Sequence, residues 1–163
     1  MSAPGSPPPA LAPRPREASI TDMVEYVLPQ HANIGGTVFG GQIMAWVDLC
    51  AAICAQRHSG HPCVTAFVDD LLFKQPVRVG QVVRLHASIV AAFRTSMEID
   101  VQVTGEDTVT GETWPTVECR VTFVAMDAAR RPTPVPPLDL RTEADREGQR
   151  AAEERRRARL AKR

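Results

Sequence analysis

Aromatic side chains are scarce in this chain, at 5% of its 163 residues, although hydrophobic residues make up 44%. A chain of this length fits one domain with flexible ends. The hydrophobic share is enough for one packed core, which aliphatic side chains must mostly fill.

An excess of charge of either sign is also missing, because 19 Lys and Arg residues balance 19 Asp and Glu residues. No overall basic field indicates nucleic acid, and no acidic excess indicates a solvating tail. No apolar run reaches the roughly 18 residues that span a bilayer. The N-terminus has no basic segment followed by an apolar one, so we expect no signal peptide. These absences predict a cytoplasmic protein with no membrane span and no nucleic-acid partner.

The four cysteines show neither CxxC spacing nor Cys/His pairing of the zinc type. They fall in stretches that read as helix and strand, so we expect buried, reduced thiols. The four are Cys50, Cys54, Cys63 and Cys119.

Proline is concentrated near both ends. Six prolines within residues 1–18 are incompatible with helix or sheet and predict an extended, disordered arm. A second cluster lies at 132–137, followed by nine basic and six acidic residues over 139–163. This last segment is expected to be a solvated appendage, helical at most, with no apolar stripe to dock, and a weak contact with an acidic partner is the alternative. The predicted division is a Pro-rich arm at 1–18, one domain at 19–128, and a Pro-rich linker with an Arg-rich charged tail at 129–163.

The segment between these ends has the pattern strand, helix, then four strands. The predicted strands are residues 20–28, 63–73, 81–92, 95–104 and 114–126, and the predicted helix is 42–57. Alternation is clearest after Thr95, where residues 97, 99, 101 and 103 are apolar and 98, 100, 102 and 104 polar, so one face should be buried and the other wet. One helix cannot cover both faces of a sheet, which excludes a doubly wound fold. We expect an α+β fold, a five-stranded antiparallel sheet around one central helix, whose edges dimerisation can pair into a continuous sheet.

The predicted helix is apolar almost all round. Its core stripe contains Ile43, Trp46, Val47, Cys50, Ile53 and Cys54, and its opposite side holds mostly Met and Ala. Asp48 is the exception, because it lies too deep in the helix to serve as an N-cap. A buried carboxylate is costly without partners. The residues alone leave two possibilities open, a catalytic base and a structural carboxylate at a solvent gap.

Gly40 and Gly41 precede this helix, so bare backbone N–H groups lie at its N-terminus. Such groups stabilise anions and developing oxyanions, and glycine permits close approach of a substrate carbonyl. Asp48, two turns on, could then flank the same carbonyl. A plain helix entry is the alternative reading of this glycine pair.

In order, these residues form a recognisable motif. The run N-x-x-G-x-x-F-G-G-x-x-M-x-W-x-D, from Asn33 to Asp48, resembles the active-site segment of hotdog-fold acyl-CoA thioesterases of the cytosolic hydrolase type and their bacterial single-domain relatives. Residues 94–98 (RTSME) and 123–126 (FVAM) are similar to later segments of the same family. The resemblance covers residues 19–128 and neither tail.

The resemblance implies a hydrolase that converts acyl-CoA to free fatty acid and coenzyme A, with no metal or redox cofactor. Asp48 matches the catalytic carboxylate, acting as general base or nucleophile, and Asn33 matches a polar residue contributed by the partner subunit. Gly40 and Gly41 would polarise the thioester carbonyl, and Thr65 would line the site. The resemblance also implies a homodimer at least, with a trimer of dimers as a larger assembly. The segment expected near coenzyme A consists of Arg94, Thr95 and Ser96.

Two other functions share this fold class. One is a non-catalytic acyl-CoA-binding regulator, in which the basic tail acts as effector, because a fold does not fix a function. The other, a dehydratase or hydratase, is disfavoured because the helix lacks an Asp/His pair. Phe93 departs from the glycine that many relatives have there. Arg57 and His58 are explained by the dipole of the helix that they end.

Overall fold

The computed structural model describes residues 10–162, and its elements follow the predicted order. The predicted boundaries are correct to within about three residues for every element from 20 to 126. The elements are β1 (Thr21–Tyr26), α1 (Gly40–Ser59), β2 (Cys63–Phe73), β3 (Val82–Ala92), β4 (Ser96–Glu106), β5 (Thr113–Ala125) and α2 (Glu143–Ala161), with short 3₁₀ turns at Arg16–Ala18 and Pro29–His31.

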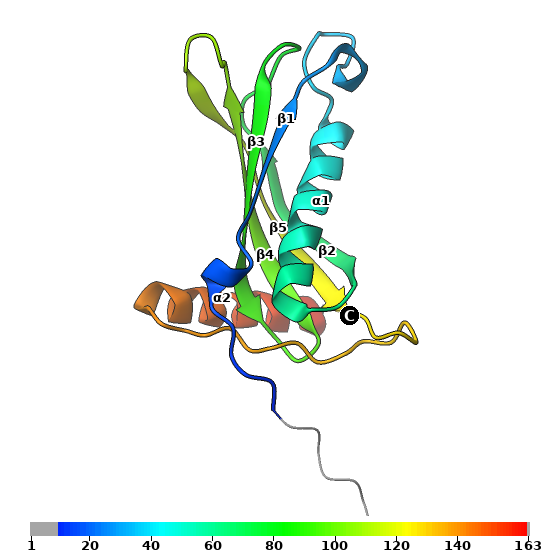
Figure 1. Ribbon diagram of the computed structural model, residues 1–163, viewed down its shortest axis with the longest axis vertical. Coiled ribbons are helices and arrows are strands. Elements are labelled where there is room, and N and C mark those ends of the chain that lie inside the picture. The colour runs from blue at the N-terminus through cyan, green and yellow to red at the C-terminus, as the bar shows by residue number, and fades with distance from the viewer. Residues whose placement is uncertain (1–9, 163) are drawn as a thin grey trace, which may run out of the picture.

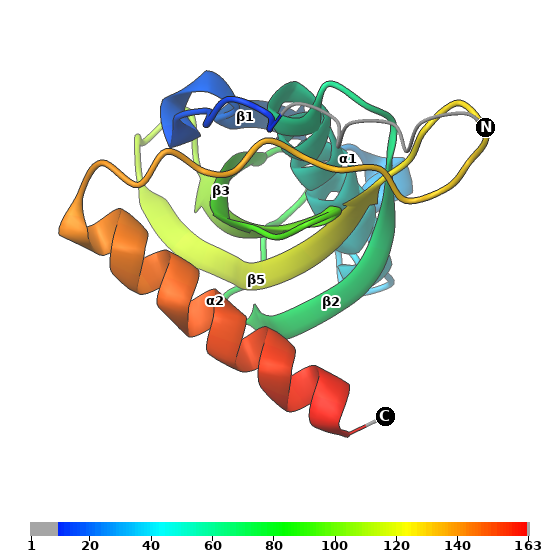
Figure 2. The ribbon, with the colours of Figure 1, turned by 90° about the horizontal axis from the view of Figure 1, so that it is seen from below.

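The five strands form one antiparallel sheet in the order β1-β3-β4-β5-β2. Figures 1 and 2 show this sheet curving around α1, which lies in its concave side. The predicted α+β hotdog arrangement is therefore confirmed. β2 follows the helix in sequence but pairs with β5, so it forms an edge of the sheet.

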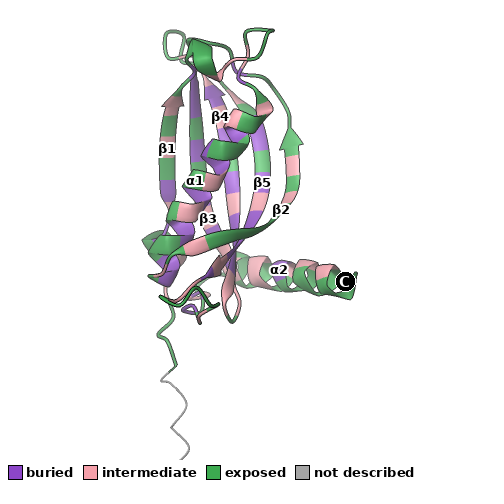
Figure 3. Cartoon of the chain, turned by 90° about the vertical axis from the view of Figure 1, so that its right-hand side faces the viewer, coloured by how far each residue is buried: buried purple, intermediate pink, exposed green. Residues whose placement is uncertain are grey.

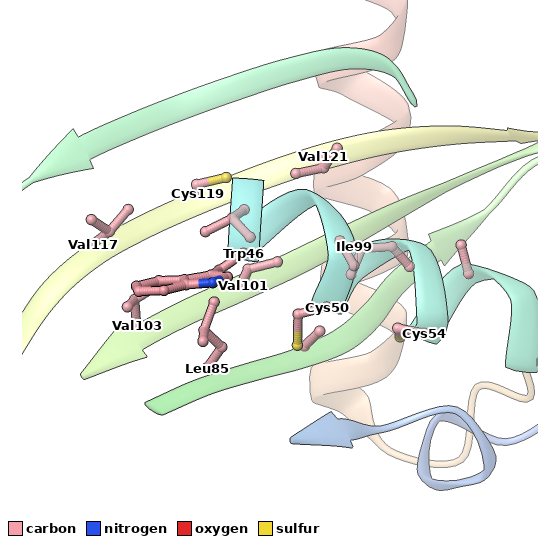
Figure 4. Packing of buried hydrophobic residues seen from close by; sticks show 14 of the residues in the cluster. Trp46, Cys50, Cys54, Leu85, Ile99, Val101, Val103, Val117, Cys119 and Val121 are labelled. Atoms are coloured by element: carbon pink, nitrogen blue, oxygen red, sulfur yellow. The ribbon is translucent and has the colours of Figure 1, made fainter. Parts of the chain in front are cut away.

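The core lies between α1 and the concave face of the sheet. Trp46 points from the helix toward Val101 and Val103 of β4 (Figure 4), and the Cys50 thiol donates to the Thr21 carbonyl of β1 at 3.5 Å. Most core side chains are aliphatic, as the scarcity of aromatics requires. All four cysteines are free, and three of them are buried, whereas Cys63 is only half-buried. Burial raises the pKa of Cys50 to about 12, so this thiol stays protonated and packs as a small apolar group.

One side of α1 is uncovered in the single chain. Ile53, which was predicted to join the core, is 38% exposed, and Leu49 is 55% exposed. Ala51 and Ala55, expected on the opposite side, are fully buried. The helix is turned about its own axis relative to the prediction, so that the small side chains of Ala51 and Ala55 face the core. The exposed side is therefore apolar, which is typical of a surface that another chain covers.

The edge strand β2 adjoins this uncovered side, and Figure 3 shows it exposed along most of its length. Within residues 10–162 it pairs only with β5, so its outer N–H and C=O groups have no strand partner. Free edges of this kind pair with other chains unless they are blocked. The expected dimer through a continuous sheet remains a prediction. The exposed large apolar side chains of β2 are Val64, Phe67, Val68, Leu72 and Phe73.

The N-terminal arm is ordered over the part that the structure describes. Residues 1–9 lie outside the described residues, but residues 14–18 contradict the expected disorder. The Arg14 N–H donates to the Pro137 carbonyl, and the Arg14 guanidinium donates to the carbonyls of Arg57 (2.8 Å) and His58 (2.6 Å). Arg14 thus satisfies carbonyls that the C-terminus of α1 leaves free.

The expectation that the charged tail has nothing to dock is wrong. α2 packs on the convex face of the sheet and passes beyond β2 (Figure 2). A Cβ on Gly148 would lie 3.3 Å from the Val90 side chain, and Gln149 exchanges two hydrogen bonds with the backbone of Ala92. Ala152 is fully buried. Small and polar side chains make this contact, so the apolar pattern of the sequence does not reveal it.

Glu98 explains how so charged a helix can dock. It was predicted to be wet, but it is 1% exposed because Arg155 of α2 covers it, with Arg155 Nη2 2.5 Å from Glu98 Oε1. A buried carboxylate is tolerated when a cation pairs with it and donates hydrogen bonds. No helix within residues 10–162 is long and apolar enough to cross a membrane.

Candidate active site

At the N-terminus of α1, two glycines pack closely against two phenyl rings. A Cβ on Gly41 would lie 2.5 Å from Cε2 of Phe39, and one on Gly40 would lie 3.2 Å from Cζ of Phe73. The Gln42 N–H donates to the Phe39 carbonyl, whereas the N–H groups of Gly40 and Gly41 have no partner within residues 10–162. Free N–H groups at a helix N-terminus favour negative charge. The two glycines therefore form a candidate oxyanion-binding element.

Asp48 lies in the middle of α1 and is half-buried. Thr65 of β2 donates its hydroxyl hydrogen to Asp48 Oδ1 at 2.5 Å. This bond fixes the carboxylate and leaves Oδ2 available to a further partner. Sequence reasoning placed both residues in one site, and the structure brings them together.

A small apolar cavity adjoins the Asp48 carboxylate between α1, β2 and β5. Apart from Asp48 itself, its wall is made of Met44, Val47, Val68, Leu71, Cys119 and Val121. The predicted helix stripe points to Val47, but no motif in the sequence marks the side chains from β2 and β5. An aliphatic group beside a fixed carboxylate would be shielded from water here.

Asn33 organises its own loop. Its Oδ1 accepts hydrogen bonds from the N–H groups of Gly35 (2.9 Å) and Thr37 (3.3 Å), and its Nδ2 donates to the Thr37 hydroxyl (3.0 Å). This is the turn role that asparagine commonly has. None of these bonds reaches Asp48, so a single chain does not bring the two residues together.

The helix itself keeps its N-terminus away from Asp48. Eight residues separate Gly40 from Asp48, which at the usual rise per residue is about 12 Å along the axis. The N–H groups of Gly40 and Gly41 therefore cannot flank the same carbonyl as the Asp48 carboxylate of the same chain. Within one chain the glycine pair and Asp48 do not form one site, and a site that combines them across two chains stays a prediction.

The three residues expected near coenzyme A are divided between two depressions. Thr95 and Ser96 line a groove beside α2, while Arg94 lines a separate one with His61 and Val135. Phe93, which replaces the common glycine, lies under the Arg156 guanidinium at 5.1 Å. Phe93 thus contacts α2.

Sequence reasoning missed the basic residues of α2 at this groove. Their signal was the acid-free stretch 155–162, which was interpreted as a solvated tail. Within residues 10–162, no cluster of three or more His, Cys, Asp or Glu side chains could hold a metal ion. The polar groups of the candidate site are the Asp48 carboxylate, the Thr65 hydroxyl and the backbone N–H groups of Gly40 and Gly41.

Comparison with protein families places this geometry in context. The model of the thioesterase superfamily matches residues 35–112. An uncharacterized acyl-CoA thioester hydrolase of Zymomonas mobilis is 38% identical over 112 residues, which cover 69% of this chain and 75% of that protein. Acyl-coenzyme A thioesterase 11 of Mus musculus is 41% identical over 110 residues, covering 68% of this chain. The chain spans only 18% of that mouse protein and 25% of a similar rat acetyl-coenzyme A thioesterase.

Solved structures agree over most of the chain. An apo-hexameric acyl-CoA thioesterase matches with a TM-score of 0.87 and 35% identity, covering 93% of this chain and 97% of that one. An acyl-CoA hydrolase of Staphylococcus aureus, in complex with butyryl coenzyme A, coenzyme A and coenzyme A disulfide, matches with a TM-score of 0.82 and 30% identity over 91% of each chain. Further structures of that hydrolase carry single alanine substitutions of an aspartate, an asparagine and a threonine.

Proposed function

The chain belongs to the thioesterase superfamily, and on that premise we propose that it hydrolyses acyl-CoA thioesters to free fatty acid and coenzyme A. The observation that carries the proposal is the Asp48 carboxylate, held by Thr65 beside an apolar cavity. Such an arrangement suits a base that works next to an acyl chain. Coenzyme A belongs to the substrate, and the reaction needs no other cofactor.

In this mechanism Asp48 acts as general base. The Thr65 hydroxyl holds Oδ1, and Oδ2 takes a proton from water while the water oxygen attacks the thioester carbon. The carbonyl oxygen becomes an oxyanion, which backbone N–H groups stabilise. The C–S bond then breaks, and the proton held by Asp48 passes to the leaving thiolate. The products are a carboxylic acid and the free thiol of coenzyme A.

A second chain completes the site in this proposal. Because Asn33, Gly40 and Gly41 lie at one end of α1 and Asp48 in its middle, the N-terminal group of one protomer would face Asp48 of its partner. The exposed edge of β2 and the uncovered side of α1 supply a surface for such a dimer. We further propose a trimer of dimers, in line with the hexameric relative.

The Staphylococcus aureus hydrolase supports this choice of residues. The asparagine, aspartate and threonine substituted in that protein are separated by 15 and 17 positions. Asn33, Asp48 and Thr65 have the same order and the same spacing. That protein binds coenzyme A and butyryl coenzyme A, which supports an acyl-CoA as the substrate of this chain.

The test is turnover of a panel of acyl-CoA thioesters, followed with a thiol reagent, by the wild type and by Asp48→Asn. This substitution keeps the shape and removes the base, so we expect kcat to fall about 10²–10⁴-fold. Asp22→Asn, an exposed carboxylate on β1, is the matched control and should turn over like the wild type. Unchanged turnover by Asp48→Asn would refute the assignment. Binding of acyl-CoA by the wild type without release of coenzyme A would favour the non-catalytic regulator instead.

A further inference from the structure

The edge strand β2 is irregular at two points where it pairs with β5. Its register shifts between Thr65 and Phe67 and again between Asp69 and Leu72. Such shifts are β-bulges, in which an extra residue redirects the side chains that follow it. Both bulges are defined by the pairing with β5, and neither depends on the outer edge of β2 that the expected dimer would use.

The two bulges give part of β2 a period of three toward α1. In a regular strand, successive side chains point to opposite faces of the sheet. Thr65 pairs with Phe123 and Val68 pairs with Val121, and both partners belong to the core between the sheet and α1. Leu71 packs against the same core cluster. The strand therefore turns Thr65, Val68 and Leu71 toward the helix, although they are three residues apart.

The second bulge exchanges the faces of Asp70 and Leu71. These two residues lie opposite the single residue Cys119 of β5. Regular pairing would set Asp70 opposite Cys119 and point its carboxylate into the core. Instead Leu71 takes the core side, and Asp70 points to the other face, where Arg120 Nη1 donates to Asp70 Oδ2 at 2.5 Å. The bulge thus keeps a charge out of the core and brings an aliphatic side chain into it.

Asp70 holds this bulge in two ways. Its backbone has a φ of 51°, a left-handed conformation that aspartate and asparagine adopt far more readily than β-branched residues. Its carboxylate pairs with Arg120, whose Nε also lies 3.8 Å from Asp100 Oδ1. Backbone strain persists only where the surrounding structure imposes it, and it is concentrated at functional sites. The strained residue here directly precedes a side chain of the Asp48 cavity.

The cavity beside Asp48 has an open side and a buried side. Met44 and Val68 in its wall are 43% and 42% exposed, whereas Cys119 is 2% exposed. The cavity volume is about 20 Å³, enough for one water-sized group such as a methyl. Leu71 is the largest side chain that the sheet contributes to this wall. Truncating it would therefore enlarge the cavity more than truncating any other sheet residue there.

We propose that Leu71 limits the length of the acyl group that this chain hydrolyses, and that Asp70 and Arg120 position it from the opposite face of the sheet; this rests on the proposed function. With the thioester carbon at Asp48, a short acyl group of about two to four carbons fits the cavity, and the Leu71 side chain blocks a longer one. Leu71 is thus a specificity-determining residue. Asp70 and Arg120 are positioning residues that act through it.

The first test compares two neighbouring leucines of β2. Leu71→Ala enlarges the cavity, and Leu72→Ala removes the same atoms from a side chain that is 57% exposed and lies outside the cavity wall. For the wild type and each variant, kcat/KM is measured with acetyl-CoA, butyryl-CoA and octanoyl-CoA. A wild type that prefers the two short substrates supports the proposal.

The two leucine variants should differ in the ratio of kcat/KM for octanoyl-CoA to that for acetyl-CoA. We expect Leu71→Ala to raise this ratio about 10-fold or more, since each methylene that an apolar pocket accommodates contributes about fourfold. Leu72→Ala should keep it within about twofold of wild type. A wild type that prefers octanoyl-CoA, or the same ratio in both variants, would overturn the inference.

Substitutions behind Leu71 test the bulge itself. Asp70→Asn retains a side chain that tolerates the left-handed backbone, whereas Asp70→Val introduces a β-branched one that does not. We expect Asp70→Asn to keep the wild-type ratio and Asp70→Val to raise it about 10-fold, because Leu71 then leaves the cavity. Arg120→Met, which removes the ion pair alone, should raise it about two- to fivefold. A general loss of stability would lower both rates together, so an unchanged ratio in Asp70→Val or in Arg120→Met would contradict the positioning role.

Binding of non-hydrolysable S-alkyl coenzyme A thioethers separates this inference from the proposed function. Calorimetry compares the ethyl and octyl thioethers with the wild type, Leu71→Ala and Leu72→Ala. We expect Leu71→Ala alone to improve binding of the octyl thioether relative to the ethyl one, by about 10-fold. The same relative affinity in all three proteins would overturn the inference even where hydrolysis is observed. A wild type that favours the ethyl thioether but hydrolyses no thioester would refute the proposed function and leave the role of Leu71 in place.

Discussion

The hydroxyl of Thr65 donates to Asp48 Oδ1 at 2.5 Å and thereby joins the edge strand β2 to the middle of α1. The bond ties the carboxylate to the strand that is expected to pair with a second chain. A shift of β2 would therefore move Thr65 and change the orientation of the Asp48 carboxylate, which is the proposed base.

Replacing Thr65 with valine keeps the shape of the side chain and removes the hydroxyl. Asp48 then loses the partner that orients it, so we expect kcat to fall about 10-fold, the value of one hydrogen bond to a charged group. Steady-state kinetics with an acyl-CoA measures the effect. Thr65→Ser, which restores the hydroxyl, should recover most of the loss, and an equally poor serine variant would argue that packing matters here.

Mixing two inactive variants tests whether Asn33 acts across subunits. A mixed dimer of one Asn33→Ala chain and one Asp48→Ala chain has two sites if the sites are shared between subunits. One site then carries both substitutions, and the other has wild-type Asn33 and wild-type Asp48. We therefore expect co-expressed, differently tagged hybrids to regain up to about half of the wild-type activity per dimer, while each variant alone stays inactive. If both residues act within one chain, every site in the hybrid carries a substitution and no activity returns.

Removing the cation that covers Glu98 should destabilise the fold. Arg155→Met leaves a buried carboxylate without its partner, and we expect a loss of about 3–5 kcal/mol in the free energy of unfolding. Urea denaturation measures it. Arg157→Met, an exposed change on the same helix, should stay within about 0.5 kcal/mol of wild type. Adding Glu98→Leu to Arg155→Met should restore part of the stability, and failure to do so would mean that Arg155 acts mainly through packing.

His58 predicts a loss of stability at acidic pH. Burial lowers the pKa of His58 below 6.5, partly opposed by its hydrogen bond with the Pro136 carbonyl. The unfolded chain then takes up a proton more readily than the folded one, so stability is present above pH 6.5 and lost as the pH falls below it. Urea midpoints between pH 8 and pH 5 should fall more steeply for the wild type than for His58→Gln. Parallel curves would contradict this role.

Much of the hotdog arrangement could be predicted because periodicity and turn residues act locally. The alternation of β4 identified the buried positions from Met97 to Val103, and the proline and glycine clusters marked the turns. Glu98 failed that prediction because its burial depends on Arg155, which lies 57 residues further along the chain. The prediction that Ile53 joins the core failed because the side of α1 that faces the sheet depends on how closely the sheet approaches Ala51 and Ala55.

The sequence by itself determined the order of strands and helix, the lone carboxylate of the apolar helix and the glycine pair at its start. These follow from short-range preferences and from an ordered motif. Only the tertiary structure decided that Thr65 holds Asp48, that Asn33 and Asp48 lie apart in one chain, and that α2 covers the sheet. Each depends on the distance between segments that are far apart in the sequence. Side-chain pairing and packing set these distances, and local residue patterns do not encode them.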